Sequence, residues 1–358
     1  MLITAIENFV LLSSLLAIAC FAIAWAAKLL VLRGSWTPQP QTLTRLYSGT
    51  IVMPPIVAAW IVTAAFLPEW WLGEAAFKSA HPGPAHDLHL IGQLTANLEP
   101  ALAYLTASFV VSAVTFAALS SWRGYVRVGQ VIGRLDMNAE PPSTEQLALV
   151  QKYASRYSLN VGLVMSSYPL SFVWGFRHSK LILSTGLLGA LTGSELQGVL
   201  EHEVAHHQRR DNLMKLALSF CGYTSLAFPL SRLLLKWLTV EVEKICDEVA
   251  VSRTRAPLEI ASALVKVRRH TSGPVVPLQS ATSGLLTVDT AAFEQRVRRL
   301  MGFLDAPPMN SEARSLATVR IAEILTITAA FSSSVTALII FSPLAVHRGV
   351  ESLIHIIK

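Results

Sequence analysis

The chain has little charge and little cysteine for its length. Charged residues make up 15% of the 358 positions and hydrophobic residues 52%, whereas an average soluble chain is about 25% charged. This composition, with a mean hydropathy of +0.48, excludes a water-soluble, disordered or collagen-like chain and favours a membrane protein with several spans. The three cysteines are odd in number and lie in apolar or helical surroundings, so they imply no disulfide framework. Neither a phosphate-binding glycine loop nor a nucleic-acid module is visible, so we expect no direct binding of nucleic acid despite the net charge of +6.

Long apolar runs are the most prominent feature that the sequence does contain. Four uncharged runs, at residues 9–27, 47–67, 100–122 and 324–346, are long enough to cross a hydrocarbon core of about 30 Å. Pro54 and Pro55 predict a kink in the second run. A shorter stretch, Leu216–Ser231, is interrupted by Gly222 and Pro229. It is either a re-entrant membrane hairpin or a buried pair of core helices, and the sequence favours neither.

Basic residues decide the expected orientation of these runs. Lys28, Arg33 and Arg45 lie between the first two runs with no acidic residue, whereas acidic residues predominate between the second and third runs. The positive-inside rule then places the N-terminus outside and the first and third connections in the cytoplasm. We therefore expect three spans in residues 1–122, a cytoplasmic domain in 123–320, a fourth span in 321–346 and a short external tail in 347–358.

A metal-binding pattern lies in the expected cytoplasmic domain. Ser194-Glu-Leu-Gln197 has the form of a capping box, and apolar residues follow at helical spacing, so we expect a helix from about Ser194 to Arg210. This helix carries His202-Glu203-Val-Ala-His206, the pattern HExxH. Residues four apart share a helix face, so the two imidazoles can bind one metal ion. Glu203 lies on the adjoining surface, where it can take a proton from a metal-bound water. The plain alternative is a pair of solvated histidines.

A third ligand is available downstream, in a second helical stretch at residues 240–248. Glu243 and Asp247 are four apart and share a face, so Glu243 can bind zinc while Asp247 accepts the free ring N–H of a ligand histidine. Two histidines and one glutamate leave a fourth position for water, which is typical of a catalytic rather than a structural site. We therefore expect one Zn²⁺ ion per chain. Cys246 is a rival ligand, and an exposed acid is the plain alternative for Glu243.

Several segments together resemble a known group of enzymes. They are Leu181–Leu188, then Leu191–His206 with the following Arg210-Asp211, and Glu243–Glu248. These segments look like those of the gluzincin membrane peptidases. With four spans around a cytoplasmic insertion, the chain most resembles the BlaR/MecR family of signalling metallopeptidases. The HtpX-like and CAAX prenyl proteases, which share HExxH and the downstream Glu-x3-Asp, are the more distant resemblance.

The BlaR/MecR resemblance implies a fold and a site. The fold is a mainly α membrane protein with four transmembrane helices and a cytoplasmic α+β gluzincin-like zinc metalloprotease domain inserted before the last span. The resemblance implies that His202, His206 and Glu243 bind zinc and that Glu203 is the general base and acid. It also implies that Asp247 orients a ligand histidine without binding the metal itself. It also implies a location in the bacterial cytoplasmic (inner) membrane.

The same resemblance implies a biological role. The best-known members cleave a cytoplasmic repressor after an external sensor binds a β-lactam, but this chain contains no Ser-x-x-Lys, so we do not expect it to sense a β-lactam by itself. We expect a membrane zinc endopeptidase that cleaves a cytoplasmic regulator, such as a transcriptional repressor, or a membrane-proximal protein. The alternatives are an HtpX-like quality-control protease and a non-catalytic signal transducer with structural zinc. The expected partners are a protein or peptide substrate and the lipid bilayer, and a homo-oligomer stays open.

Short strands before the HExxH helix indicate how a substrate binds. In the resembling proteases an edge strand here pairs with an extended substrate backbone, and we assign that edge to Phe172, Val173, Trp174 and Gly175. An ordinary buried strand is the alternative. The oxyanion of the reaction needs a donor besides zinc, and the candidates are Tyr223, Arg253 and Arg255.

Overall fold

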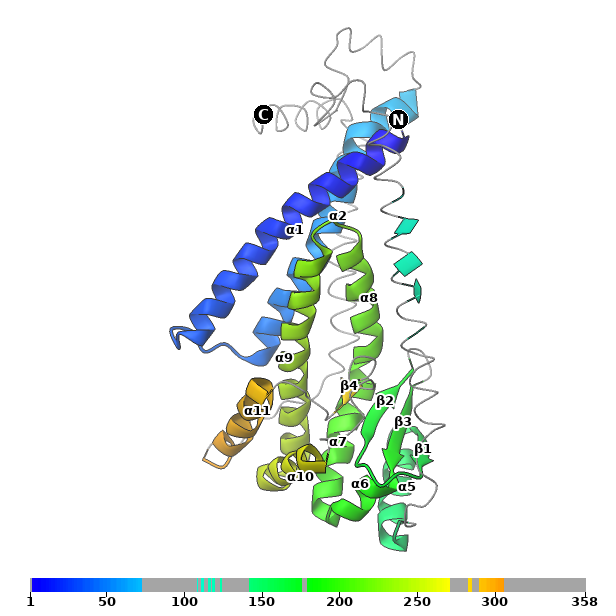
Figure 1. The fold of residues 1–358 in the computed structure, drawn as a ribbon, viewed down its shortest axis with the longest axis vertical. Helices are drawn as coiled ribbons and strands as arrows, with labels where there is room; N and C mark the ends of the chain where they lie inside the picture. Colours follow the sequence, from blue (N-terminus) through cyan, green and yellow to red (C-terminus); the bar gives the residue numbers. More distant parts are fainter. Residues whose placement is uncertain are drawn as a thin grey trace.

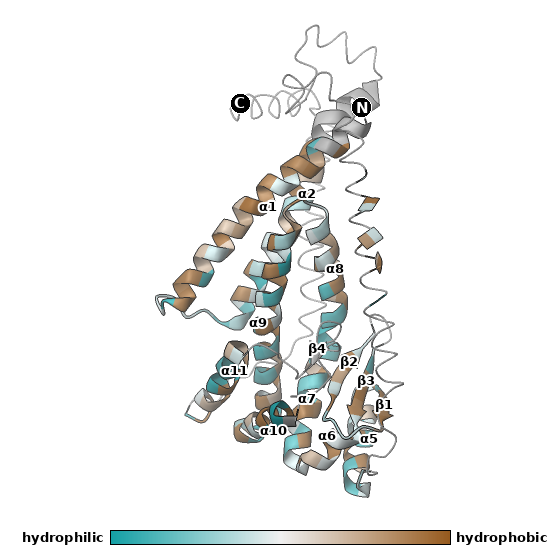
Figure 2. Ribbon diagram, viewed as in Figure 1, coloured by the Kyte–Doolittle hydropathy of each residue, from teal (hydrophilic) through white to brown (hydrophobic). Residues whose placement is uncertain are grey.

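Two long apolar helices form one part of the molecule. The computed structural model describes residues 2–72, 142–175, 179–270, 283–284 and 290–305, with isolated helical positions between 108 and 123. Helix α1 (Leu2–Leu32) and helix α2 (Pro40–Leu72) lie side by side (Figure 1). By length and composition, Asn8–Leu32 and Pro40–Thr63 can each cross a membrane. Figure 2 shows α1 hydrophobic along most of its length, and its exposed side chains include Leu15, Ile18 and Ile23.

The four predicted spans differ in how far the structure describes them. The first two runs lie within α1 and α2, and α2 is an unbroken helix through Pro54 and Pro55. The third run is described only at isolated helical positions, and the fourth lies outside the described residues. The described part of the chain therefore supports a mostly helical protein with two candidate membrane helices, and the four-span layout stays a prediction.

A small sheet and seven described helices form the other part. The strands are β1 (Asn160–Val164), β2 (Ser171–Trp174), β3 (Lys180–Ser184) and β4 (Ser283–Gly284). They lie in the order β1-β3-β2-β4, with β1 parallel to β3 and β2 antiparallel to both of its neighbours. The helices described in this part, apart from the α8–α9 hairpin below, are α5 (Thr144–Tyr157), α6 (Thr185–Ala190), α7 (Gly193–Arg209), α10 (Pro257–His270) and α11 (Thr290–Gly302).

Helix α7 is the predicted HExxH helix, but its capping residue differs from the prediction. Thr192, in an extended conformation, accepts a hydrogen bond from the Glu195 N–H, and the Glu195 side chain accepts one from the Thr192 N–H. The capping box therefore begins two residues before Ser194. Ser194 is already helical, and its hydroxyl donates to Glu259 instead. Among the residues of the core around α7 are Leu196, Leu200 and Val204, together with residues of β3, α6 and α10.

The expected free edge at β2 is wrong for its central residues. Phe172 pairs with Ile182 of β3 on one side and with Gly284 of β4 on the other, and Val173 pairs with Leu181 and Ser283. Residues 283 and 284 lie more than a hundred positions downstream, so local periodicity could not reveal this partner. No pairing with β4 extends to Trp174 or Gly175 in the described register.

The apolar stretch Leu216–Ser231 forms the tip of a helical hairpin. Helix α8 (Asp211–Tyr223) and helix α9 (Phe228–Thr254) are joined by a turn, and both pack on α2. The turn is bound to α1, because Ser13 Oγ donates to the Thr224 carbonyl at 3.3 Å and the Leu226 N–H donates to Ser14 Oγ at 2.9 Å. The hairpin therefore lies along the two apolar helices (Figure 1).

Candidate metal centre

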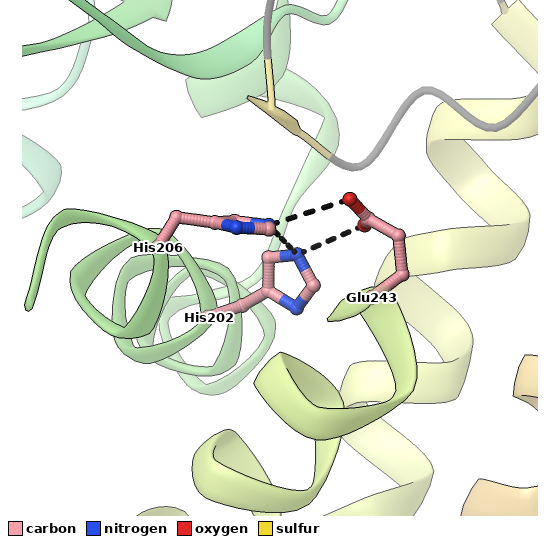
Figure 3. Close-up of side chains that lie close together, drawn as sticks. All are labelled: His202, His206 and Glu243. Atoms are coloured by element: carbon pink, nitrogen blue, oxygen red, sulfur yellow. Dashed lines mark hydrogen bonds and ion pairs between the residues drawn. The ribbon is translucent and has the colours of Figure 1, made fainter. Parts of the chain in front are cut away.

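The structure brings His202, His206 and Glu243 together between α7 and α9. The two histidine Nε2 atoms are 3.2 Å apart, His202 Nε2 lies 3.4 Å from Glu243 Oε2, and His206 Nε2 lies 3.5 Å from Glu243 Oε1. Figure 3 shows the imidazoles of α7 and the carboxylate of α9 directed at one another. All three side chains are buried. Ligand atoms about 2.0–2.1 Å from a tetrahedral zinc ion lie about 3.3 Å from one another, so the spacing of these atoms fits the ion.

Each histidine has a carboxylate behind its other ring nitrogen. His202 Nδ1 lies 2.9 Å from Oδ1 of Asp247, the residue predicted for this position. His206 Nδ1 lies 2.7 Å from Oδ2 of Asp211. A carboxylate that accepts the Nδ1 proton leaves Nε2 free to bind a metal and sets the direction of the ring. Asp211 therefore orients His206 through a hydrogen bond, and Asp247 lies within ion-pair distance of the corresponding nitrogen of His202.

Asp211 is a residue of this site to which the sequence analysis assigned no role. It begins α8, directly after Arg210 ends α7 with a left-handed φ of 52°. That reversal brings Asp211 back against His206. Burial alone would raise the pKa of Asp211, but Arg209, whose Nε donates to Oδ1 at 3.1 Å, and His206 together lower it. The only signal in the sequence was the adjacent Arg210-Asp211 pair in the motif.

Glu203 has one oxygen held and one oxygen free of hydrogen bonds. Ser171 of β2 donates to Oε1 at 2.8 Å. Oε2 is buried and has no hydrogen-bond partner among the described residues. Burial raises the pKa of Glu203, although the two histidines oppose that rise. A buried carboxyl with a raised pKa and a free oxygen is suited to take up and release a proton.

Glu243, in contrast, is held in its charged form. Burial opposes ionisation, but the charges of His206 and Arg296 lower the pKa of Glu243 well below its ordinary value. A carboxylate must be deprotonated to bind zinc. The environment of this side chain is therefore suited to a metal ligand.

Cys246 lies on the other side of His206. Its Sγ is 3.4 Å from His206 Nδ1 and 3.8 Å from Asp211 Oδ2, so His206, Asp211 and Cys246 form a second group that could hold a metal. Burial raises the pKa of the Cys246 thiol, which disfavours the thiolate that a metal needs. A metal in this group would also need His206 Nδ1 as a ligand, and that atom already forms a hydrogen bond with Asp211. The trio with Glu243 is the better fit.

The three candidates for an oxyanion donor lie elsewhere. Tyr223 ends α8 and Arg255 follows the end of α9, each twelve residues, or about 18 Å of helix, from Asp211 and Glu243 respectively. Arg253 donates to Glu201 and to Gln208. Helix length separates two of the candidates from the site and an ion pair engages the third, so the described residues support none of the three and the choice of donor stays open.

A small pocket opens beside His206, at the end of β2. It is lined by Val173, Gly175, Ser179, His206, His207, Arg210, Asp211 and Asn212. Asn212 fixes the strand end there, because its Nδ2 donates to the carbonyls of Val173 and Gly175 at 2.8 and 3.3 Å. The predicted substrate strand thus reaches the metal centre at its Gly175 end, and its role in binding stays a prediction.

The part of the chain that carries this site has recognisable relatives. Residues 145–267 match peptidase family M48. Protease HtpX of Legionella pneumophila (strain Corby) is 32% identical over 111 residues, which are 29% of this chain and 39% of that protein. The protease HtpX homolog of Burkholderia thailandensis is 27% identical over 168 residues, or 37% of this chain and 58% of the relative. The similarity supports a membrane zinc metallopeptidase.

The same comparisons limit what can be transferred. A third relative, the protease HtpX homolog of Thermoanaerobacter pseudethanolicus, is 28% identical over 114 residues, which are 38% of its length. The chain thus spans less than two thirds of each of these relatives. They correspond to the HtpX-like resemblance that the sequence analysis placed second. The BlaR/MecR resemblance stays a prediction.

Proposed function

We propose that this chain is an HtpX-like membrane zinc endopeptidase that cleaves membrane or membrane-proximal proteins. The observation that carries the proposal is the meeting of His202, His206 and Glu243, with their ligand atoms spaced as zinc requires and Glu203 beside them. Three protein ligands leave a coordination position for water, which is typical of catalytic zinc. The similarity to HtpX proteases over this part of the chain supports the same activity.

The residues around the trio have distinct tasks in peptide hydrolysis. Bound zinc would supply Lewis acidity toward a water and toward the scissile carbonyl. Glu203 accepts the proton of that water at Oε2 and delivers it to the leaving amine, while Ser171 holds Oε1 in place. Asp211 and Asp247 keep the two imidazoles in the orientation that leaves both Nε2 atoms for the metal.

The position of the site relative to α1 supports a membrane-proximal substrate. Trp237 of α9 lies against Phe21, Trp25 and Tyr47, and Lys28 Nζ lies 5.9 Å from its ring centre. Glu243 follows Trp237 by six residues, or about 9 Å along α9. The metal centre thus lies just beyond the Lys28 end of α1. If α1 spans the bilayer, peptide segments close to the membrane surface are within reach of the site.

Other parts of the expected role have no structural support of their own. Cleavage of a transcriptional repressor, regulated signalling and a homo-oligomer stay predictions, as does a cytoplasmic position of the active site. Orientation can be measured with reporter fusions. A periplasmic signal from a fusion after Gly129 would contradict the predicted topology.

Metal analysis and proteolysis of the full chain in detergent test the proposal. We expect the wild type to bind one zinc and to hydrolyse casein. Glu203→Ala should also bind one zinc and lose about 10²- to 10⁴-fold in rate, the usual contribution of a general base. Gln197→Ala changes an exposed residue of the same helix and should retain both properties. A wild type without zinc would refute the metal assignment, and a fully active Glu203→Ala would refute the base.

A further inference from the structure

We propose that Arg296 is a positioning residue of the metal centre, an inference that rests on the proposed function. Arg296 lies on α11, downstream of the segment that matches peptidase family M48. It is completely buried, and it is the largest of the fully buried side chains among the described residues. A buried arginine must be paired to be tolerated. Its partners include two carboxylates of the metal centre.

The guanidinium group of Arg296 donates two hydrogen bonds to the Asp247 carboxylate. Arg296 Nε donates to Oδ2 at 2.7 Å and Nη2 donates to Oδ1 at 2.8 Å. Two parallel bonds fix the plane of a carboxylate as well as its distance. Oδ1 of Asp247 is also the atom that lies 2.9 Å from His202 Nδ1. Arg296 therefore sets, through Asp247, the direction of a metal-binding imidazole.

The third nitrogen reaches the predicted metal ligand itself. Arg296 Nη1 lies 3.2 Å from Oε2 of Glu243, the oxygen that also lies 3.4 Å from His202 Nε2, and Oε1 of Glu243 lies 3.5 Å from His206 Nε2. A cation at one carboxylate oxygen favours binding of the metal through the other. A carboxylate that used both oxygens would raise the coordination number and crowd the position that a catalytic site leaves to water. We infer that Arg296 keeps Glu243 a one-oxygen ligand.

Helix α11 carries a second arginine that separates this role from simple anchoring. Arg299 Nε donates to Glu248 Oε1 at 2.6 Å, so it also ties α11 to α9. Glu248 in turn accepts from Gln41 at 3.4 Å and belongs to neither metal-binding group. Arg299→Met thus removes an ion pair between the same two helices and leaves the metal centre untouched. It is the matched control for Arg296→Met.

Cobalt substitution of the full chain in detergent tests the proposal, because the visible bands of Co²⁺ report ligand geometry. Arg296→Met should shift these bands and weaken them, since a two-oxygen Glu243 raises the coordination number. Casein hydrolysis should fall in kcat with little change in KM, because Arg296 contacts no substrate. Arg299→Met should keep the wild-type spectrum and kcat. Arg296→Lys keeps the buried positive charge but cannot donate two parallel hydrogen bonds to Asp247. This variant should therefore fold and show the same spectral change as Arg296→Met.

The outcomes distinguish this proposal from the proposed function. A wild type that binds cobalt and cleaves casein, beside an Arg296→Lys variant with an unchanged spectrum and kcat, would overturn the role of Arg296 alone. Equal spectral changes in Arg296→Lys and Arg299→Met would reduce Arg296 to a helix anchor and overturn it as well. A wild type that binds no cobalt and cleaves nothing would instead refute the proposed function.

Discussion

Replacing Asp211 by asparagine tests how far the metal centre depends on the carboxylate behind His206. Asp211 is 1% exposed and lies 2.7 Å from His206 Nδ1, and it also accepts from Arg209, which is 6% exposed. Loss of a carboxylate that orients a ligand histidine lowers metal affinity by about 10- to 100-fold. We therefore expect the zinc dissociation constant of Asp211→Asn to rise by that factor.

The same substitution should also destabilise the fold. Removal of one partner from a buried ion pair costs about 3–5 kcal/mol, because the other charge is left uncompensated. The variant Arg209→Met/Asp211→Asn removes both charges, so it should recover much of the stability but not the zinc affinity. Zinc competition against a chromogenic chelator and thermal unfolding of the metal-free chain measure the two effects separately. Wild-type zinc affinity in Asp211→Asn would refute the role assigned to this carboxylate.

Three further predictions concern packing, pH and the metal. Gly186→Ala should destabilise the chain by about 1–3 kcal/mol, because a Cβ there would lie 2.3 Å from the Ser167 carbonyl oxygen. The control is Gly189→Ala on the same helix, where a Cβ meets nothing within 4 Å. Equal unfolding temperatures of the two variants would contradict the prediction. Burial alone would raise the pKa of Glu195, but Lys266 and the other partners of this carboxylate lower the pKa below the ordinary 4.5. The contribution of Glu195 to the stability of the fold is therefore complete above pH 4.5 and is lost as the pH falls through the lowered pKa. Glu195→Gln should therefore lower Tm at neutral pH and converge with the wild type in acid, and a constant difference would contradict this. A chelator should lower Tm and zinc at about 100 times its dissociation constant should restore about 2.7 kcal/mol, whereas an unchanged Tm would mean that the folded chain holds no metal.

The parts of the site that lie on one helix face could be predicted from the sequence. His202 and His206 are four residues apart, and so are Glu243 and Asp247, and helix geometry alone places each pair on one side. The structure brings the two pairs together, with Asp247 2.9 Å from His202. Their roles as ligands and outer partner stay predictions until a metal is measured.

The remaining parts depend on long-range packing. Asp211 faces His206 only because α7 stops at Arg210 and the chain reverses there. Arg296 reaches Asp247 from a helix about fifty residues further on, so no local pattern in the sequence links the two residues. The edge expected at β2 is wrong for its central residues for the same reason, because their second partner is Ser283–Gly284. Hydrophobic periodicity carries no information about such partners.

Zinc K-edge X-ray absorption of the full chain tests the central claim most directly. If His202, His206 and Glu243 hold the ion, the first shell contains only nitrogen and oxygen at about 2.0–2.2 Å. A sulfur at about 2.3 Å would place the metal instead with His206, Asp211 and Cys246, the second group in the described part of the chain, and would contradict the account.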